Sequence, residues 1–194
     1  RLLYGHDLIA VELYHVICDG KGALTFLCSL VARYLELRHS VIIPREGLVL
    51  DCATAPSAQE LEDGFLRHAA PVGAAPHEPH VYLLHGDTEP RGTSHITTGI
   101  ASTQEVLDAA HAHGVSVTSL LVAAMTQTIL EIQRDDAPHK RRKPVHLRVP
   151  VDLRALFDSP TLRNFSLVVN LGVTARSEPY RFDELCTTIQ KQMR

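Results

Sequence analysis

The segment at residues 13–22 constrains the fold of this chain most, because it joins a strand to a helix within a few residues. Residues 8–13 are rich in apolar and β-branched side chains, which predicts a buried strand. Beyond the segment, apolar side chains recur at three- and four-residue spacing, which predicts a helix from Gly20 to about Arg38. His15 is therefore expected where the strand ends, and Asp19 where the helix begins.

Asp19 is well suited to start this helix. Its carboxylate can accept hydrogen bonds from the free N–H groups of the first turn, and its charge is favourable at the positive end of the helix dipole. Gly20 and Gly22 allow a tight turn and a close approach of the backbone to another group. We therefore expect a tight connection from strand to helix, with His15 at its start.

The spacing His15-x-x-x-Asp19-Gly20 at a strand-to-helix junction resembles the chloramphenicol-acetyltransferase-like superfamily. That group includes plant acyltransferases, nonribosomal condensation domains and the bacterial alcohol acetyltransferases, which this chain resembles most closely. The resemblance implies that His15 is the general base and that Asp19 is structural, paired with an arginine. Tyr14 stands where many members carry a first histidine, but the base corresponds to the second, here His15.

Three later segments resemble the same family, in the family's order: residues 116–124, 149–154 and 162–170. The second is similar to a Pro-Val-x-x-Arg stretch and the third to a Phe-Val-Asn segment. Arg154, the arginine of that stretch, is the first candidate partner of Asp19 and Arg148 is the second. Both lie on the polar face of an alternating strand. Gly20 is expected to shape the turn. Asn170 is expected either to support substrate or to be an ordinary polar strand residue.

The order of elements predicts a mixed α/β protein. A hairpin is expected within residues 1–13, and the resemblance implies a two-layer sandwich of the chloramphenicol-acetyltransferase type. The chain would supply the end of the first half (1–44), a crossover (45–80) and the start of the second half (81–194) of a longer protein. Further strands are expected at 81–84, 95–100, 145–154 and 165–171, and helices at 57–69, 102–114, 120–133 and 182–193, with Ser102 and Glu105 forming a capping box and Thr118 capping the third helix.

Composition narrows the classes of function. The chain of 194 residues carries a formal net charge of -3 with scattered basic residues, so we expect no nucleic-acid partner. The basic run at 139–143 is interpreted as a solvated loop. No apolar run has the length of a membrane span, and a cytoplasmic location is expected. The cysteines show no paired spacing, so neither a zinc site nor a disulfide framework is indicated: they are Cys18, Cys28, Cys52 and Cys186.

The expected chemistry is acyl transfer from a thioester to an alcohol or amine. A neutral imidazole suits the base, since the unperturbed pKa of a histidine side chain is about 6.5. The acceptor would attack the acyl carbonyl directly, with acetyl-CoA or another acyl-CoA as co-substrate, no permanently bound cofactor and no metal. Cys18 beside His15 is an alternative nucleophile, although catalytic partners are usually distant in sequence.

Three other interpretations remain open. A condensation-type domain would use carrier-protein thioesters on the same fold. A catalytically inactive relative would serve as a binding or scaffold module. A metal hydrolase would use His6, Glu12 and His15, although Glu12 and His15 fall on opposite faces of a strand. If strands of both halves are missing, apolar edges are exposed and the chain is expected to self-associate.

Overall fold

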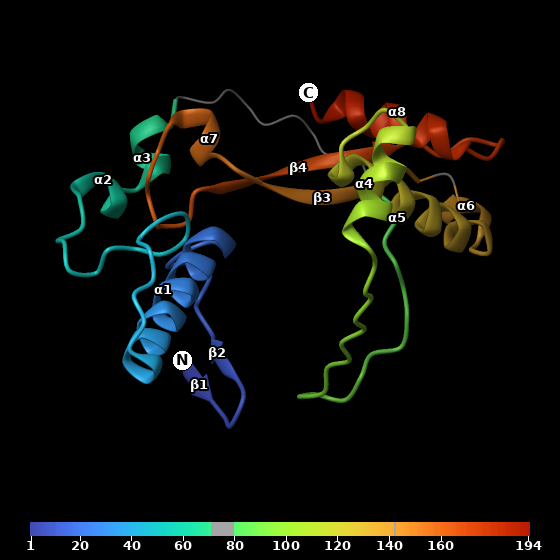
Figure 1. The fold of residues 1–194 in the computed structure, drawn as a ribbon. Helices are drawn as coiled ribbons and strands as arrows, with labels where there is room; N and C mark the ends of the chain where they lie inside the picture. Colours follow the sequence, from blue (N-terminus) through green and yellow to red (C-terminus); the bar gives the residue numbers. More distant parts are fainter. Residues whose placement is uncertain (71–79, 142) are drawn as a thin grey trace. The chain divides into compact units, whose positions relative to one another are not determined.

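The computed structural model describes residues 1–70, 80–141 and 143–194 (Figure 1). The chain forms two compact units. The first contains residues 1–74 and 150–168, and the second contains residues 75–149 and 169–194. Strands β3 (Val145–Asp152) and β4 (Ser166–Val173) pair with each other, and each begins in one unit and ends in the other. The chain therefore returns to the first unit after it has built most of the second.

The first unit begins with the expected hairpin. Strand β1 (Leu2–Tyr4) pairs antiparallel with β2 (Ile9–Val11), with Leu2 opposite Val11. The N–H of Gly5 donates to the carbonyl of Leu8 and closes the turn (2.8 Å). Helix α1 (Gly20–His39) follows and contacts β2, as Figure 1 shows. The strand-to-helix order predicted from residues 8–38 is confirmed.

The buried face of α1 differs from the face that the apolar spacing predicts. It consists of the small residues Gly22, Thr25, Ser29 and Ala32, whereas Leu24 is 48% exposed. Small side chains let another segment pass close to the helix. The hydroxyl of Ser29 accepts a hydrogen bond from the N–H of residue 50 at 2.9 Å, which holds that segment against α1.

The apolar stripe of α1 lies instead along a groove beside the hairpin. The groove has a volume of about 760 Å³ and includes Leu30, Val31, Tyr34 and Leu35 from α1. Tyr4 of the hairpin also lines it and is 83% exposed. Exposed apolar surface of this kind is what the sequence led us to expect, and self-association remains a prediction.

The single helix expected at 57–69 is wrong, because the structure has two short helices there. Helix α2 (Ala58–Leu61) begins with a capping box between Ser57 and Glu60. Glu62 is extended, and Asp63 then starts α3 (Gly64–His68) by accepting from the N–H groups of residues 65 and 66. The side chain of Asp63 accepts hydrogen bonds from the backbone, which favours the start of a new helix at this position over the continuation of α2.

The second unit is built on helices. Helix α5 (Val117–Arg134) packs against α8 (Phe182–Gln192) and α4 (Thr103–Ala112), and the short α6 (Pro138–Arg141) follows α5. Helices α4, α5 and α8 were expected from the sequence, whereas α6 was not, because the basic run at 139–143 was interpreted as a solvated loop. The buried apolar core of this unit consists of Tyr82, Ala110, Val115, Leu120, Val122, Ala123, Leu130, Val145, Leu171, Val173, Leu185, Cys186 and Ile189.

The helix caps were predicted in part. The hydroxyl of Ser102 accepts from the N–H of Glu105 at 3.4 Å, as half of a capping box would. Gly114 has φ of +66° directly after α4, so its place at the end of this helix is confirmed. Thr118 is not the cap of α5. Ser116 takes that role by accepting from the N–H of Ser119, so the helix begins earlier than expected.

Two of the predicted strands are absent from the described residues. Residues 81–84 and 95–100 have no strand conformation. Tyr82 is buried and its N–H donates to the carbonyl of Pro144, but Leu83 and Leu84 after it are exposed. Ile96 and Ile100 are 88% and 97% exposed. β-Branched residues favour a strand only when a neighbouring strand packs against them, and these segments have none.

The remaining strands confirm a mixed α/β class. Strand β3 ends at Asp152, two residues earlier than predicted, and β4 runs from Ser166 to Val173. The division of the chain at residues 44 and 80 remains a prediction. Among the described residues no single helix is long and apolar enough to cross a membrane; α4 and α5 taken together, bent by 83°, meet that length and composition.

Replacing Leu185 by alanine is expected to destabilise the protein. Leu185 on α8 is fully buried in the core of the second unit. Replacing such a leucine by alanine costs about 2–5 kcal/mol of unfolding free energy. Leu121 on α5 is 52% exposed and is the matched control, with an expected change below about 1 kcal/mol. Urea denaturation of both variants measures the difference. Equal losses would show that the core of this unit is not the one described.

Candidate active site

His15 lies in an exposed turn between β2 and α1. The turn is closed by the N–H of Ile17, which donates to the carbonyl of Tyr14 at 2.8 Å. Within the described residues of the first unit the imidazole of His15 has no hydrogen-bond partner. His15 is exposed as a residue, and neither ring nitrogen is used by a hydrogen bond there.

Asp19, at the other end of the turn, is buried and saturated with hydrogen bonds. It is 4% exposed and caps α1 by accepting from the N–H of Gly22 at 3.1 Å. The N–H of Phe165 donates to its Oδ2 at 2.9 Å. Two nitrogens of Arg154 complete the set, Nη2 to Oδ1 at 3.0 Å and Nη1 to Oδ2 at 2.8 Å. Asp19 thus holds the turn in place and does not face solvent.

Arg154 makes four side-chain hydrogen bonds and a further ion-pair contact within the first unit. Besides the two bonds to Asp19, its Nη1 donates to Asp152 at 2.8 Å. Its Nε donates to the carbonyl of Thr161 at 2.6 Å, and its Nη2 to the carbonyl of Arg163 at 2.7 Å. A guanidinium has five donors in a fixed plane, and each of its three nitrogens donates at least one hydrogen bond here. Arg154 is the partner that the sequence indicated first.

The electrostatics of the pair favour its charged form. Burial opposes ionisation of Asp19, but the hydrogen bonds from Arg154, Phe165 and Gly22 outweigh it and hold its pKa below the ordinary value. Burial likewise lowers the pKa of Arg154, and the carboxylates of Asp19 and Asp152 more than compensate. Because the folded-state pKa of Asp19 is depressed, the stabilisation is present above about pH 4 and is lost as the pH falls through the folded-state pKa.

The network extends to two residues that the sequence analysis did not identify as site residues. Asp152 accepts from both the N–H and the side chain of Arg154, and its other oxygen pairs with Lys21 at 3.3 Å. Burial raises the pKa of Asp152, but the bonds from Arg154 and Lys21 lower it overall. An acidic residue two positions before the arginine, on the same face of the predicted strand, was the available signal.

The position of Arg154 corrects one detail of the prediction. It is the first residue of the short helix α7 (Arg154–Phe157) and not the last polar residue of a strand. The carboxylate of Asp152 accepts from its N–H at 3.1 Å, which begins the helical turn. Asp158, with φ of 47°, ends it. Leaving the strand lets Arg154 become buried, 6% exposed, whereas Arg148 on β3 stays exposed.

An aromatic cluster supports the segment that follows α7. Phe165 is 1% exposed and lies edge-on to Phe65 with ring centroids 5.2 Å apart. His68 and Phe157 also contact its ring. Because the N–H of Phe165 bonds Asp19, packing of this ring fixes one donor of the site. Phe65 and His68 come from α3, Phe157 comes from α7, and Phe165 lies directly before β4, so no spacing in the sequence links these residues.

The two glycines of the turn have different roles. A Cβ atom added at Gly22 would collide with the carbonyl oxygen of Leu162 and lie 3.0 Å from the Cβ of Cys18. A Cβ atom added at Gly20 would meet nothing within 4 Å. The close approach of the backbone expected at both positions is therefore required at Gly22 alone.

Asn170 and Arg148 lie in the second unit, so they are not part of the cluster around Asp19. Asn170 is exposed on β4 and makes an interaction of its own, as does Arg148. A supporting role for Asn170 remains a prediction.

The alternative chemistries gain no support from the geometry. Burial raises the pKa of the Cys18 thiol, and the nearby charge of Asp19 adds to this, so the thiolate needed for nucleophilic attack is disfavoured. Glu12 is occupied by Arg1 at 2.6 Å. Among the described residues no group of three or more His, Cys, Asp or Glu side chains is arranged to hold a metal ion, His6, Glu12 and His15 included.

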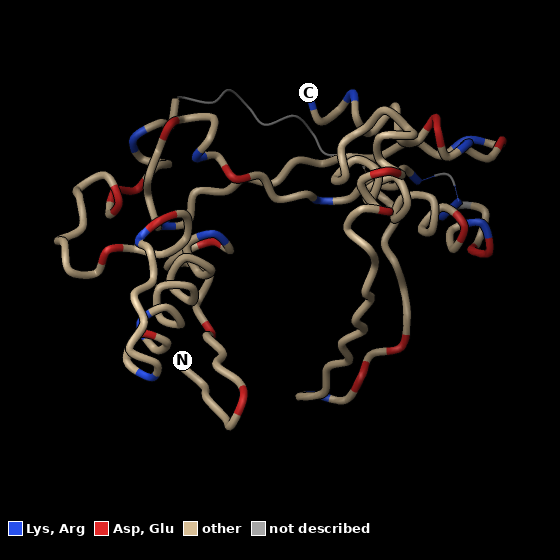
Figure 2. The backbone as a smooth tube through the Cα atoms, in the orientation of Figure 1, with Lys and Arg blue, Asp and Glu red and all other residues tan. Residues whose placement is uncertain are grey.

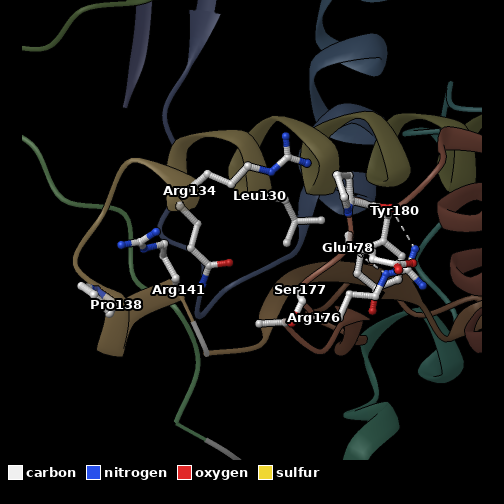
Figure 3. Close-up of a pocket in the computed structure, with 11 residues that line it drawn as sticks. Leu130, Arg134, Pro138, Arg141, Arg176, Ser177, Glu178 and Tyr180 are labelled. Atoms are coloured by element: carbon white, nitrogen blue, oxygen red, sulfur yellow. Dashed lines mark hydrogen bonds between the residues drawn. The ribbon is translucent and has the colours of Figure 1, made fainter.

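The second unit contains a pocket of about 650 Å³ beside the end of α5 (Figure 3). Arg176 at one side is fully engaged: it makes two bonds of 2.6 Å to Glu184, bonds the carbonyls of Glu178 and Pro179, and stacks on Tyr180 at 3.6 Å. It therefore shapes the loop. Two further arginines line the pocket, Arg134 and Arg141, and their guanidinium groups point in different directions in Figure 3.

Charged residues of both signs are interspersed along each unit (Figure 2), in keeping with the net charge of -3. The lining of the pocket is likewise mixed, with Glu178 beside the arginines. The pocket thus does not gather its positive charges around one ligand atom.

Comparison with known proteins gives one match. The family model described as phthiocerol/phthiodiolone dimycocerosyl transferase C-terminus matches residues 91–192, more than half of the chain. No curated protein and no solved structure matches the sequence. The matched segment includes Arg154 and Asn170, and it begins after His15 and Asp19.

Replacing Gly22 by alanine is expected to destabilise the first unit by about 1–3 kcal/mol, since the new methyl group must displace the backbone at Leu162. The control is Gly20→Ala, which has open space and a slightly better helix former, so no loss is expected. Denaturant unfolding of the two variants measures both. A neutral Gly22→Ala would contradict the close approach of residues 22 and 162.

Replacing Arg154 by lysine is expected to cost about 3–5 kcal/mol, because an ammonium cannot serve five acceptors in one plane and Asp19 is left buried and poorly paired. Arg163→Lys is the control, since the exposed Arg163 contributes only its carbonyl to the network. Thermal and urea unfolding compare the two. Similar stability for both variants would mean that the planar network is dispensable.

Proposed function

Since the chain belongs to the phthiocerol/phthiodiolone dimycocerosyl transferase C-terminus family, a condensation-like family of acyltransferases, we propose that it transfers an acyl group from a thioester to an alcohol or amine with His15 as general base. Acetyl-CoA or another acyl-CoA is the proposed donor. No bound cofactor or metal is needed for this reaction.

One observation supports assigning this activity to the turn that carries His15. The family match covers residues 91–192 and does not reach residues 15–20. Arg154 from the matched segment forms a buried ion pair with Asp19, four residues after His15. The turn and the family segment therefore share one charged network, which is a relation that chance occurrence of a His-x-x-x-Asp-Gly pattern would not produce.

The proposed reaction proceeds by direct attack. A ring nitrogen of His15 accepts the proton of the acceptor's hydroxyl or amine, and the freed lone pair attacks the thioester carbonyl carbon. The new C–O or C–N bond forms, the C–S bond breaks, and the imidazolium returns its proton to the leaving thiolate. No covalent enzyme intermediate is required. Asp19 and Arg154 are buried and bonded to each other and to the backbone, so they act by holding the turn.

The exposure of His15 is compatible with this role. Its imidazole is not consumed by a hydrogen bond within the first unit, and the neighbouring Tyr14 and Val16 are 74% and 75% exposed. An acceptor and a donor can therefore approach the same side chain. Tyr14 in place of a first histidine leaves a single imidazole at the turn.

Thiol release from acetyl-CoA, measured on the full-length protein with a panel of alcohols and amines, tests the proposal. His15→Ala is expected to lower acceptor-dependent release by about 10²–10⁴-fold, the usual contribution of a general base. Tyr14→Phe is the matched control at the adjacent exposed position and is expected to retain activity. Thermal unfolding verifies that both variants are folded.

The donor arm separates the proposed function from its closest alternative. Release from a phosphopantetheinyl carrier-protein thioester, with none from acetyl-CoA, would place the protein among condensation-type domains. Full activity of His15→Ala with either donor would overturn the mechanism. Absence of turnover with both donors and all acceptors in the wild type would favour the catalytically inactive interpretation.

A further inference from the structure

We propose that Asn164 is a positioning residue that fixes the backbone of the His15 turn for catalysis. Its side-chain Nδ2 donates a hydrogen bond to the carbonyl oxygen of His15 at 3.3 Å, across 149 residues of sequence. This inference rests on the proposed function of His15 as the base. It adds a residue that neither the family match nor the spacing around His15 assigns to that role.

Three consecutive residues converge on the turn and on its charged anchor. The carbonyl of Arg163 accepts from Arg154, the side chain of Asn164 donates to His15, and the N–H of Phe165 donates to Asp19. The segment 163–165 therefore forms hydrogen bonds at both ends of the turn, at His15 and at Asp19. Asp19 is held by several bonds at the helix end, whereas the His15 end depends on Asn164.

Asn164 is the one side chain that bonds residues 13–17 among the described residues of the first unit. Apart from it, the turn is closed there by a single backbone bond between Ile17 and Tyr14. Loss of the Asn164 contact leaves Asp19 anchored but frees the His15 backbone to move. Displacement of a catalytic group by about 1 Å can lower a rate by as much as 10²-fold.

The orientation of the Asn164 amide follows from its partners. A backbone carbonyl can only accept, so the nitrogen of the amide must face His15. The hydroxyl of Ser166 contacts the other end, Oδ1, at 3.2 Å and can donate to it. Asn164 is half-buried, and Phe165 next to it is anchored in the aromatic cluster. The donor is thus presented from a segment that is itself well packed.

The test uses Asn164→Ala and Asn164→Asp in the full-length protein. The aspartate variant keeps the size of the side chain and removes its donor. Amide hydrogen exchange is expected to rise at least threefold for residues 14–18 and to stay unchanged for α1 beyond Gly22. Asn164→Gln keeps a donor and is expected to restore part of the protection, which a nonspecific loss of structure would not allow.

Activity provides the second readout. Asn164→Ala and Asn164→Asp are expected to lower kcat about 10-fold or more with little change in KM. The contacts of the acceptor and donor remain, while the base is misplaced. Gln59→Glu, an exposed charge change on α2 of the same unit, is the control and is expected to leave kcat unchanged. Melting temperatures are expected to stay within about 4 °C of wild type, since one exposed hydrogen bond is lost.

The outcomes separate this inference from the function on which it rests. Unchanged hydrogen exchange in Asn164→Asp overturns the positioning role, whatever the activity. Unchanged kcat in both variants, with His15→Ala inactive, overturns it as well and leaves the proposed function standing. Activity that survives His15→Ala overturns the proposed function instead. Faster exchange confined to residues 14–18 together with lower kcat supports the role of Asn164.

Discussion

The buried ion pair between Asp19 and Arg154 is the interaction on which the first unit depends. Both groups are almost fully removed from water, and such a burial is stable only when every donor and acceptor is matched. All three nitrogens of the guanidinium have acceptors here: Asp19, Asp152 and the carbonyls of Thr161 and Arg163. A pair built in this way fixes the geometry of the turn between β2 and α1 more than it adds stability.

Local sequence signals correctly predicted the elements whose hydrogen bonds and caps come from residues close in the sequence. Asp19 at the start of α1, the hairpin and the long helices α5 and α8 were correct, because caps and apolar periodicity act within a few residues. The strands at 81–84 and 95–100 were wrong, because a β-branched run needs a partner that the segment itself does not specify. Arg154 as partner of Asp19 came from the resemblance to a family.

The rest of the site was beyond sequence reasoning for a physical reason. Lys21, Asn164 and Phe165 contribute through contacts whose partners lie far along the chain, and no spacing rule links them. The prediction of which face of α1 is buried was wrong for a related reason. Small residues were not recognised as its packing surface, because close approach of a backbone leaves no apolar pattern.

The return of residues 150–168 to the first unit has a consequence for how the protein is made. Arg154 follows Asp19 by 135 residues, so during synthesis the turn emerges from the ribosome long before its counter-charge exists. A carboxylate destined for burial must stay solvated in that interval, and closing so long a loop is slow. Chain elongation at about 5–20 residues per second makes that interval about 7–27 seconds for 135 residues. The site is therefore assembled late, since a nascent chain acquires it only after residues 154–165 have emerged.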